Sequence, residues 1–242
     1  MKDKLKNFSG FSARSFEFMQ GLKVNNNRAW FESRRADWEA LKSELQAVCA
    51  ALAPFLGELD PELETDPKTG RCLGRIFRDI RFTADKRLFR ESVDVLFFPD
   101  ACGRTKAPGF AVGLRADICY IGTWMGSSML EWRRRFAANI AAFPEAFELY
   151  LEANNNFRDL TLRSDSYKKE RVPGLPPLAR QWAQRKYYYL TGMVPAAEAI
   201  RLGHKILGRI EEAFLRLYPL YLFATSDHPA QELERFKSKF GK

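Results

Sequence analysis

The stretch FAVGLRADICYIG, residues 110–122, places apolar side chains at every second position. One face carries Phe110, Val112, Leu114, Ala116, Ile118 and Tyr120, and the other face carries Arg115 and Asp117. A period of two is the pattern of a half-buried β-strand, so the sequence predicts a single strand here. Shorter apolar runs predict strands over residues 75–82, 93–98, 157–163 and 187–190, with a hairpin connection over residues 99–109.

A long amphipathic helix precedes these strands. From Arg28 to about Phe55 the large apolar residues recur at three- and four-residue steps, and Asn27 is a suitable N-cap. Ser128 with Glu131 predicts a capping box at the start of another helix. The predicted shorter helices span residues 12–22, 128–143, 144–154, 178–185 and 195–217. Helices at both ends with strands between them predict an α+β fold, in which long amphipathic helices pack on a largely antiparallel sheet.

The organisation of the chain favours one domain. It shows no internal repeat, low-complexity tract or strong linker, so a single domain over residues 1–242 is predicted. The core is expected over about residues 11–222, and residues 226–242 are expected to form a polar, mobile tail. A composition of 46% hydrophobic and 29% charged residues is that of a globular protein.

Composition also limits which binding partners and which cellular compartment we expect. No apolar run reaches the roughly 18 residues of a membrane span, and the N-terminal segment MKDKLKNFSG lacks the apolar stretch of a signal peptide. We therefore expect no membrane partner. The four cysteines form no Cys-x-x-Cys pair, which favours reduced thiols in a cytoplasmic protein. The formal net charge of +9 is compatible with anionic partners. The oligomeric state is left open.

The stretch RCLGRIFRDIRFTADKRLFR, residues 71–90, is the strongest functional signal. It carries seven basic side chains but only two carboxylates, those of Asp79 and Asp85, and the charges lie inside an apolar run. An unpaired charge costs several kcal/mol or more to bury, so these cations must be paired or must face a pocket. We therefore expect an anion-recognising site here.

Strand geometry would divide the arginines of this motif between two faces. Arg75, Asp79 and Arg81 would share one face, and Arg78 would lie in the opposite, apolar row. Guanidinium forks match carboxylate and phosphate oxygens bidentately, and Lys86 would add a point charge. The predicted ligand contacts are Arg75, Arg78, Asp79, Arg81, Asp85 and Lys86. The alternative, that the arginines only pair with Asp79, Asp85 and other carboxylates, stays open.

Two further positions are candidates for ligand binding. Asn26 lies in the Asn25–Asn27 turn before the long helix, where free backbone N–H groups and the helix dipole favour an anion, although ordinary capping is the alternative. Trp124 lies between two glycines after a predicted strand, either as a stacking surface or as a core residue. The Arg133–Arg135 triplet is interpreted as a solvated helix face.

The sequence lacks the residue patterns that several common catalytic and cofactor sites require. His204 and His228 have no metal-ligating partner at helical spacing, so no metal is predicted. The chain contains no G-x-S-x-G elbow, no P-loop and no G-x-G-x-x-G motif. No cofactor is predicted, and whether the protein is an enzyme is left open.

The central motif also carries a family resemblance. RIFRDIRFTADK, residues 75–86, resembles the core motif of domain of unknown function 2461, an uncharacterised and mainly bacterial family that is also found in fungi. NNRAWF at 26–31, GTWM at 122–125 and RVPG at 171–174 are similar to further family motifs, whereas residues 88–90 replace the family's Pro-Tyr-Lys. The similarity covers about residues 11–222. It implies a shared α+β fold and a shared Arg/Asp/Lys centre, and it implies no activity.

Three functional hypotheses follow from the sequence. The first is a cleft, centred on the Arg/Asp/Lys motif, that binds a small phosphate- or carboxylate-bearing ligand. The second is a nucleic-acid-binding module, which requires Arg133–Arg135 and Lys168–Arg171 to share a face with the central motif. The third is a structural or interaction protein in which the arginines brace the core.

Overall fold

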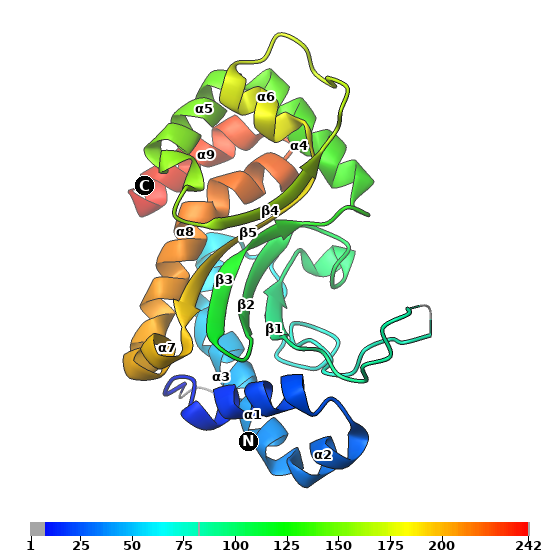
Figure 1. The fold of residues 1–242 in the computed structure, drawn as a ribbon. Helices are drawn as coiled ribbons and strands as arrows, with labels where there is room; N and C mark the ends of the chain where they lie inside the picture. Colours follow the sequence, from blue (N-terminus) through cyan, green and yellow to red (C-terminus); the bar gives the residue numbers. More distant parts are fainter. Residues whose placement is uncertain (1–7, 82, 242) are drawn as a thin grey trace.

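The centre of the protein is a five-stranded antiparallel sheet (Figure 1). The computed structural model describes residues 8–81 and 83–241. The strands are β1 (Val93–Phe97), β2 (Gly109–Leu114), β3 (Ile118–Met125), β4 (Thr161–Ser166) and β5 (Arg185–Pro195), in the spatial order β1-β2-β3-β5-β4. Each neighbouring pair is antiparallel, which confirms the predicted fold class.

The prediction of a single strand over residues 110–122 is wrong, because the chain reverses within it. The Arg115 N–H donates to the Ile118 carbonyl at 2.9 Å and closes a three-residue turn between β2 and β3. The polar residues of the turn continue the alternation of the flanking strands, which hides the reversal in the sequence. The paired residues Leu114 and Cys119 enclose an even number of residues, so odd and even positions exchange faces between β2 and β3, and Tyr120 lies on the opposite face from Phe110.

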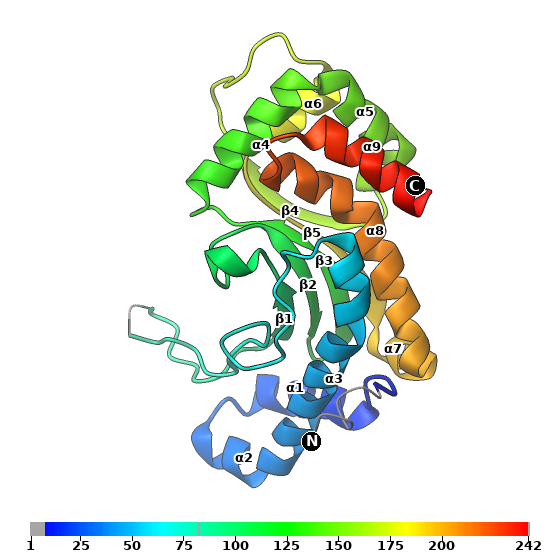
Figure 2. The same cartoon turned by 180° about the vertical axis from the view of Figure 1, so that it is seen from behind.

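Two long helices, α3 (Arg35–Leu59) and α8 (Ile206–Thr225), cover one face of the sheet (Figure 2). Phe214 of α8 contacts Phe97 of β1 and Phe110 of β2, with ring centroids 6.0 and 4.9 Å apart. The buried strand residues on the covered face include Val95, Phe97, Phe110, Val112, Leu114, Cys119, Ile121, Tyr188, Leu190 and Val194. This layer forms the core and leaves the opposite face of the sheet to form the candidate site.

The predicted helix over residues 28–55 divides into two helices. α2 (Arg28–Ser33) ends at Arg34, whose ψ of 18° leaves the helical region, and α3 begins directly afterwards. Asn27 caps α2, because its Oδ1 accepts from the Trp30 N–H at 3.0 Å, and the predicted N-cap is therefore confirmed. α1 (Ala13–Val24) precedes this pair and packs on α3.

The capping box predicted at Ser128 and Glu131 is wrong. α4 begins at Leu130, so Met129 holds the cap position, and the Met129 side chain makes no capping hydrogen bond. The predicted helix over residues 195–217 also divides, because Gly203 adopts a φ of 54° between α7 and α8. The other helices are α4 (Leu130–Ala142), α5 (Pro144–Ala153), α6 (Pro177–Ala183), α7 (Ala196–Leu202) and α9 (Pro229–Phe240).

The segment after Ser226, predicted as a mobile polar tail, contains α9. The residues Leu233 and Phe236 of this helix are buried, and the Phe236 ring lies 5.1 Å from the Tyr218 ring of α8. The sequence prediction failed here because charged residues surround a narrow apolar stripe. Within the described part of the chain, no helix combines the length and the apolar character needed to cross a membrane.

The central motif is not the predicted strand over residues 75–82. Its described residues form an irregular loop that projects from the sheet (Figure 1), and Phe82 lies outside the described residues. The loop pairs briefly with its own return segment, because the Arg78 N–H donates to the Leu88 carbonyl at 2.9 Å and the Arg90 N–H donates to the Ile76 carbonyl at 2.8 Å.

Candidate functional site

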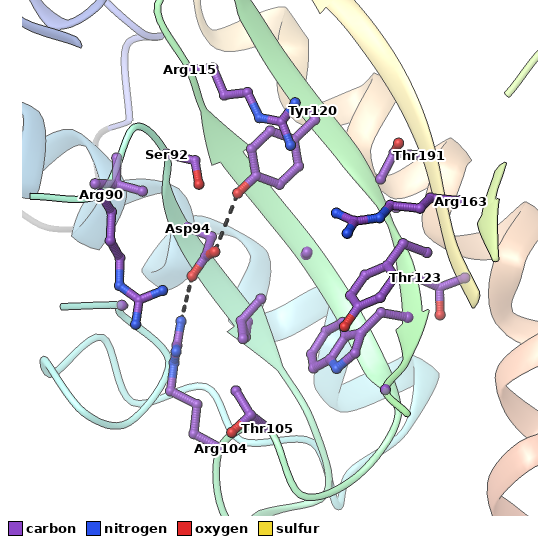
Figure 3. Close-up of a pocket in the computed structure, with 18 of the residues that line it drawn as sticks. Arg90, Ser92, Asp94, Arg104, Thr105, Arg115, Tyr120, Thr123, Arg163 and Thr191 are labelled. Atoms are coloured by element: carbon purple, nitrogen blue, oxygen red, sulfur yellow. Dashed lines mark hydrogen bonds and ion pairs between the residues drawn. The ribbon is translucent and has the colours of Figure 1, made fainter. Parts of the chain in front are cut away.

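A cavity of about 620 Å³ lies on the face of the sheet that α3 and α8 do not cover (Figure 3). Its floor follows the strand register, which aligns side chains in rows across the sheet. The central row consists of Leu96, Ala111, Gly122, Thr191 and Thr161. These side chains are mostly small, and larger residues in the rows on either side form the walls. The small side chains of the central row therefore leave a hollow on this face of the pleated sheet.

Two aromatic rings of β3 lie across glycines of β2. A Cβ atom at Gly113 would lie 2.3 Å from the Tyr120 ring, and a Cβ atom at Gly109 would lie 2.9 Å from the Trp124 ring. Because glycine has no side chain, each ring can lie close to the neighbouring strand. Trp124 is only 6% exposed, so it serves mainly as a packing residue of the floor.

Five arginines line the cavity, and they come from separate parts of the chain. They are Arg75 and Arg90 from the two ends of the central loop, Arg104 from the β1–β2 connection, Arg115 from the β2–β3 turn and Arg163 from β4. The lining carries one carboxylate, that of Asp94 on β1. The cavity is therefore strongly positive.

Asp94 neutralises only one of these arginines. Arg104 forms an ion pair and hydrogen bond with Asp94 Oδ1, and the Tyr120 hydroxyl donates to Asp94 Oδ2 at 3.3 Å (Figure 3). Burial raises the pKa of Tyr120 well above its ordinary value, and the charge of Asp94 raises it further. Tyr120 therefore stays protonated as a hydrogen-bond donor. The network fixes Arg104 and Tyr120 at one side of the cavity.

Within the described part of the chain, the other arginines have no carboxylate partner. Among the described residues, no carboxylate oxygen lies within 4.0 Å of the side-chain nitrogens of Arg75, Arg90 or Arg163. Arg115 lies over the Tyr120 ring, with its Cζ 5.4 Å from the centroid, and Arg163 lies 6.0 Å from the centroid of Tyr189. Cation–π contacts of this kind orient a guanidinium but leave its N–H groups free to donate.

Hydroxyl groups complete the polar lining. Ser92, Thr105, Ser127, Ser128, Thr161 and Thr191 all line the cavity. Each hydroxyl can donate to an anion or accept from a ligand N–H. Among the described residues, no group of three or more His, Cys, Asp or Glu residues is placed to hold a metal ion. The arrangement is suited to holding an anion with several oxygen atoms.

Of the residues predicted from the sequence, Arg75 and Trp124 line the cavity. The others lie outside its lining, and most are engaged in the projecting loop. Arg78 pairs with Asp85 at 2.5 Å, and Arg81 pairs with Asp79 at 2.7 Å.

The remaining two predicted residues bond to backbone. Lys86 Nζ donates to the Ile80 carbonyl at 3.1 Å. Asn26 Nδ2 donates to the Phe89 carbonyl at 3.0 Å, and Asn26 Oδ1 accepts from the Phe89 N–H at 2.9 Å, so its amide anchors the return segment of the loop. At the tip of the loop, the arginines thus form local ion pairs, which is the alternative that the sequence left open. Ligand binding by the residues outside the lining stays a prediction.

Local hydrogen bonds shift the carboxyl groups of this loop. Hydrogen bonds from Arg81 lower the pKa of Asp79 to about 2. Hydrogen bonds from Arg87 and Arg78 hold the pKa of Asp85 far below its ordinary range. Both carboxylates therefore stay ionised at neutral pH and cannot act there as proton donors.

Sequence reasoning missed Arg90, Arg104, Arg115, Arg163 and Tyr189 as site residues. The sequence predicts Arg163 at the end of a strand, and it predicts Arg115 inside a strand rather than at a turn. The alternation of β5, in which Tyr189, Thr191 and Met193 share one face, was a signal that could have located the open side of the sheet. Convergence of the arginines depends on strand order, which the sequence does not reveal.

A comparison with protein families matches most of the chain. Residues 14–223 match the sequence profile of a family described as "Conserved hypothetical protein (DUF2461)". The chain belongs to this family. The match contains all the residues that line the cavity, whereas α9 lies beyond it. None of the curated proteins compared with this DUF2461 chain matches it.

Proposed function

We propose that this DUF2461 protein binds a small phosphate- or carboxylate-bearing anion in the cavity on the open face of its sheet. The observation that carries the proposal is the presence of Arg75, Arg90 and Arg163 on one cavity without a carboxylate partner among the described residues. Like charges that share a cavity repel one another, and a bound anion would offset this cost.

The chemistry of the lining favours an anion with several oxygen atoms. Arginine binds phosphate and carboxylate bidentately, so guanidinium groups from opposite walls can hold different oxygens of one group. Tyr120 supplies a further donor whose orientation Asp94 fixes. The central row of small side chains leaves room for the ligand above the floor. The four free cysteines are compatible with the reducing compartment of the proposed cytoplasmic location.

Thermal unfolding in the presence of anions tests the proposal. The panel is inorganic phosphate, pyrophosphate, di- and tricarboxylates, and nucleoside mono-, di- and triphosphates, all at matched ionic strength. A ligand at 100 times its Kd stabilises the native state by about 2.7 kcal/mol, which raises the Tm measurably. Arg90→Gln and Arg163→Gln should each reduce the shift.

Two further variants make the test specific. Arg201→Gln removes an exposed charge on α7 that does not line the cavity, and it should keep the full shift. Arg78→Gln reports whether the projecting loop contributes to binding as the sequence predicts. A panel without any stabilising anion would contradict the proposal, as would a shift that persists unchanged in both cavity variants.

A further inference from the structure

We infer that the anion is part of a single-stranded nucleic acid, which continues from the cavity to a second basic cluster around Tyr167. This inference rests on the proposed function, because the cavity supplies the first phosphate position. The second position, called here the Tyr167 cluster, consists of Tyr167, Arg133, Arg171 and Lys186.

Three cations surround one tyrosine ring in the Tyr167 cluster. Arg171 Cζ lies 4.6 Å from the ring centroid, Arg133 Cζ lies 5.5 Å away, and Lys186 Nζ lies 5.6 Å away. Tyr167 directly follows β4, Lys186 lies in β5, and Arg133 lies in α4, so the cluster combines three elements. The exposed residues Lys168 and Lys169 add charge beside it.

Most of this charge is not neutralised within the protein. Lys186 pairs with Asp165 at 2.8 Å. Arg133 donates to the backbone carbonyls of Ser127 and Lys186, both at 3.2 Å, and neither Arg133 nor Arg171 has a carboxylate partner among the described residues. The two cations without a carboxylate partner, Arg133 and Arg171, lie 5.5 and 4.6 Å from one ring and repel each other, and an external phosphate would offset this repulsion.

The cluster is contiguous with the cavity. Ser127 lines the cavity, and its carbonyl accepts the hydrogen bond from Arg133. A second connection is aromatic, because the ring of Tyr189 at the cavity lies 5.9 Å from the ring of Tyr187, one residue from Lys186. A chain of phosphates therefore meets basic groups at both ends of this path and aromatic rings between them.

The exposed ring of Tyr189 favours single-stranded nucleic acid over other polyanions. Tyr189 is 40% exposed although it lies in the sheet, and Arg163 lies above its ring. Unpaired bases stack on tyrosine rings and on guanidinium planes, whereas the bases of a duplex are already stacked on one another. Inorganic polyphosphate would use the arginines and leave the rings unused. Basic surface with interleaved aromatic residues is the pattern of single-strand binding proteins.

Fluorescence anisotropy with a labelled, 5′-phosphorylated oligonucleotide of about eight nucleotides tests the inference. Single-stranded DNA, single-stranded RNA and the corresponding duplex are titrated over a range of salt concentrations. Arg171→Gln should lower the magnitude of the salt slope by about 0.7, because one phosphate contact on a single strand is lost. Tyr189→Leu should weaken binding by roughly 5- to 150-fold, and Tyr189→Phe, which keeps the ring, should not.

The outcomes separate the two proposals. If small anions stabilise the protein at the cavity but the oligonucleotide binds no more tightly than they do, the nucleic-acid inference is wrong and the proposed function survives. Duplex binding equal to single-strand binding overturns the role of the exposed Tyr189 ring. Oligonucleotide binding that Arg163→Gln leaves unchanged overturns the continuity with the cavity. Circular dichroism and the Tm of each variant confirm that it is folded, and Arg201→Gln serves again as the charge-matched control.

Discussion

The ring of Tyr120 lies over Gly113 of the neighbouring strand, where a Cβ atom would come within 2.3 Å of the ring. The same glycine leaves no room towards β1, because this Cβ atom would also lie 2.6 Å from the Val93 carbonyl oxygen. A backbone oxygen cannot rotate away as a side chain can. The position of Tyr120, and with it one wall of the cavity, therefore depends on the absence of a side chain at residue 113.

Replacing this glycine tests the dependence. Gly113→Ala should lower the free energy of unfolding by about 1–3 kcal/mol, because the methyl group overpacks the sheet, and it should also weaken anion binding by displacing Tyr120. The matched control is Gly57→Ala on α3, where a Cβ atom meets nothing within 4 Å. This change should stabilise the protein by about 0.5–1 kcal/mol. Urea unfolding measures both, and equal effects would contradict the packing argument.

The carboxylate of Asp94 offsets part of the positive charge of the cavity. In Asp94→Asn the amide oxygen can still accept from Tyr120, but Arg104 loses its ionic partner. We expect a loss of about 1–3 kcal/mol in unfolding free energy, together with tighter anion binding because the cavity gains net positive charge. Parallel measurements of unfolding and of binding check both signs. Weaker anion binding in a folded Asp94→Asn protein would show that Asp94 contacts the ligand favourably.

The carboxyl groups of the projecting loop should titrate separately and at low pH. Asp79 should show a midpoint of about 2, and Asp85 should titrate lower still. Because both pKa values are lower in the folded than in the unfolded chain, their stabilisation is fully present above pH 3.8 and is lost as the pH falls through the folded values. NMR titration of the side-chain carboxyl carbons measures both midpoints.

Arg87→Gln separates the two carboxyl groups. Arg87 is the main partner of Asp85, so its removal should raise the Asp85 midpoint. The Asp79 midpoint depends on Arg81 and should not move. A parallel shift of both midpoints would mean that the loop titrates as one coupled unit.

The C-terminal helix should contribute measurably to stability. Phe236 is 5% exposed and packs on Tyr218, so Phe236→Ala should cost about 3–5 kcal/mol. Gln231→Ala, an exposed change on the same helix, should have little effect. Denaturant unfolding measures both variants. A mobile tail, as the sequence suggested, would leave both variants as stable as the parent protein.

The fold class followed from the sequence because periodicity reports local burial. The three- and four-residue steps of α3 and the alternation within β2 are properties of single elements, and a helix and a strand do form there, although the predicted boundaries ran through the break at Arg34 and the turn at Arg115. The turn at Arg115 was missed because its polar residues continue the alternation on either side. Strand order and the convergence of distant arginines are tertiary properties that no local pattern contains.

The candidate site was only partly predicted for a related physical reason. The high charge density of residues 71–90 was real, but its carboxylates neutralise nearby arginines, as in the pair of Asp79 with Arg81 two residues away. Only the two ends of the loop, at Arg75 and Arg90, reach the cavity. A run of basic residues in a sequence thus indicates where charge is concentrated, and the tertiary structure determines which of it stays unpaired.

The strand order β1-β2-β3-β5-β4 has a consequence for biosynthesis. A nascent chain that has been synthesised only to β3 contains β1, β2 and β3, and with them Arg104 and Arg115 of the proposed binding surface. Arg163 joins this surface only after β5 has been made and has inserted between β3 and β4. Full ligand affinity would therefore arise late in translation and would distinguish finished molecules from truncated ones.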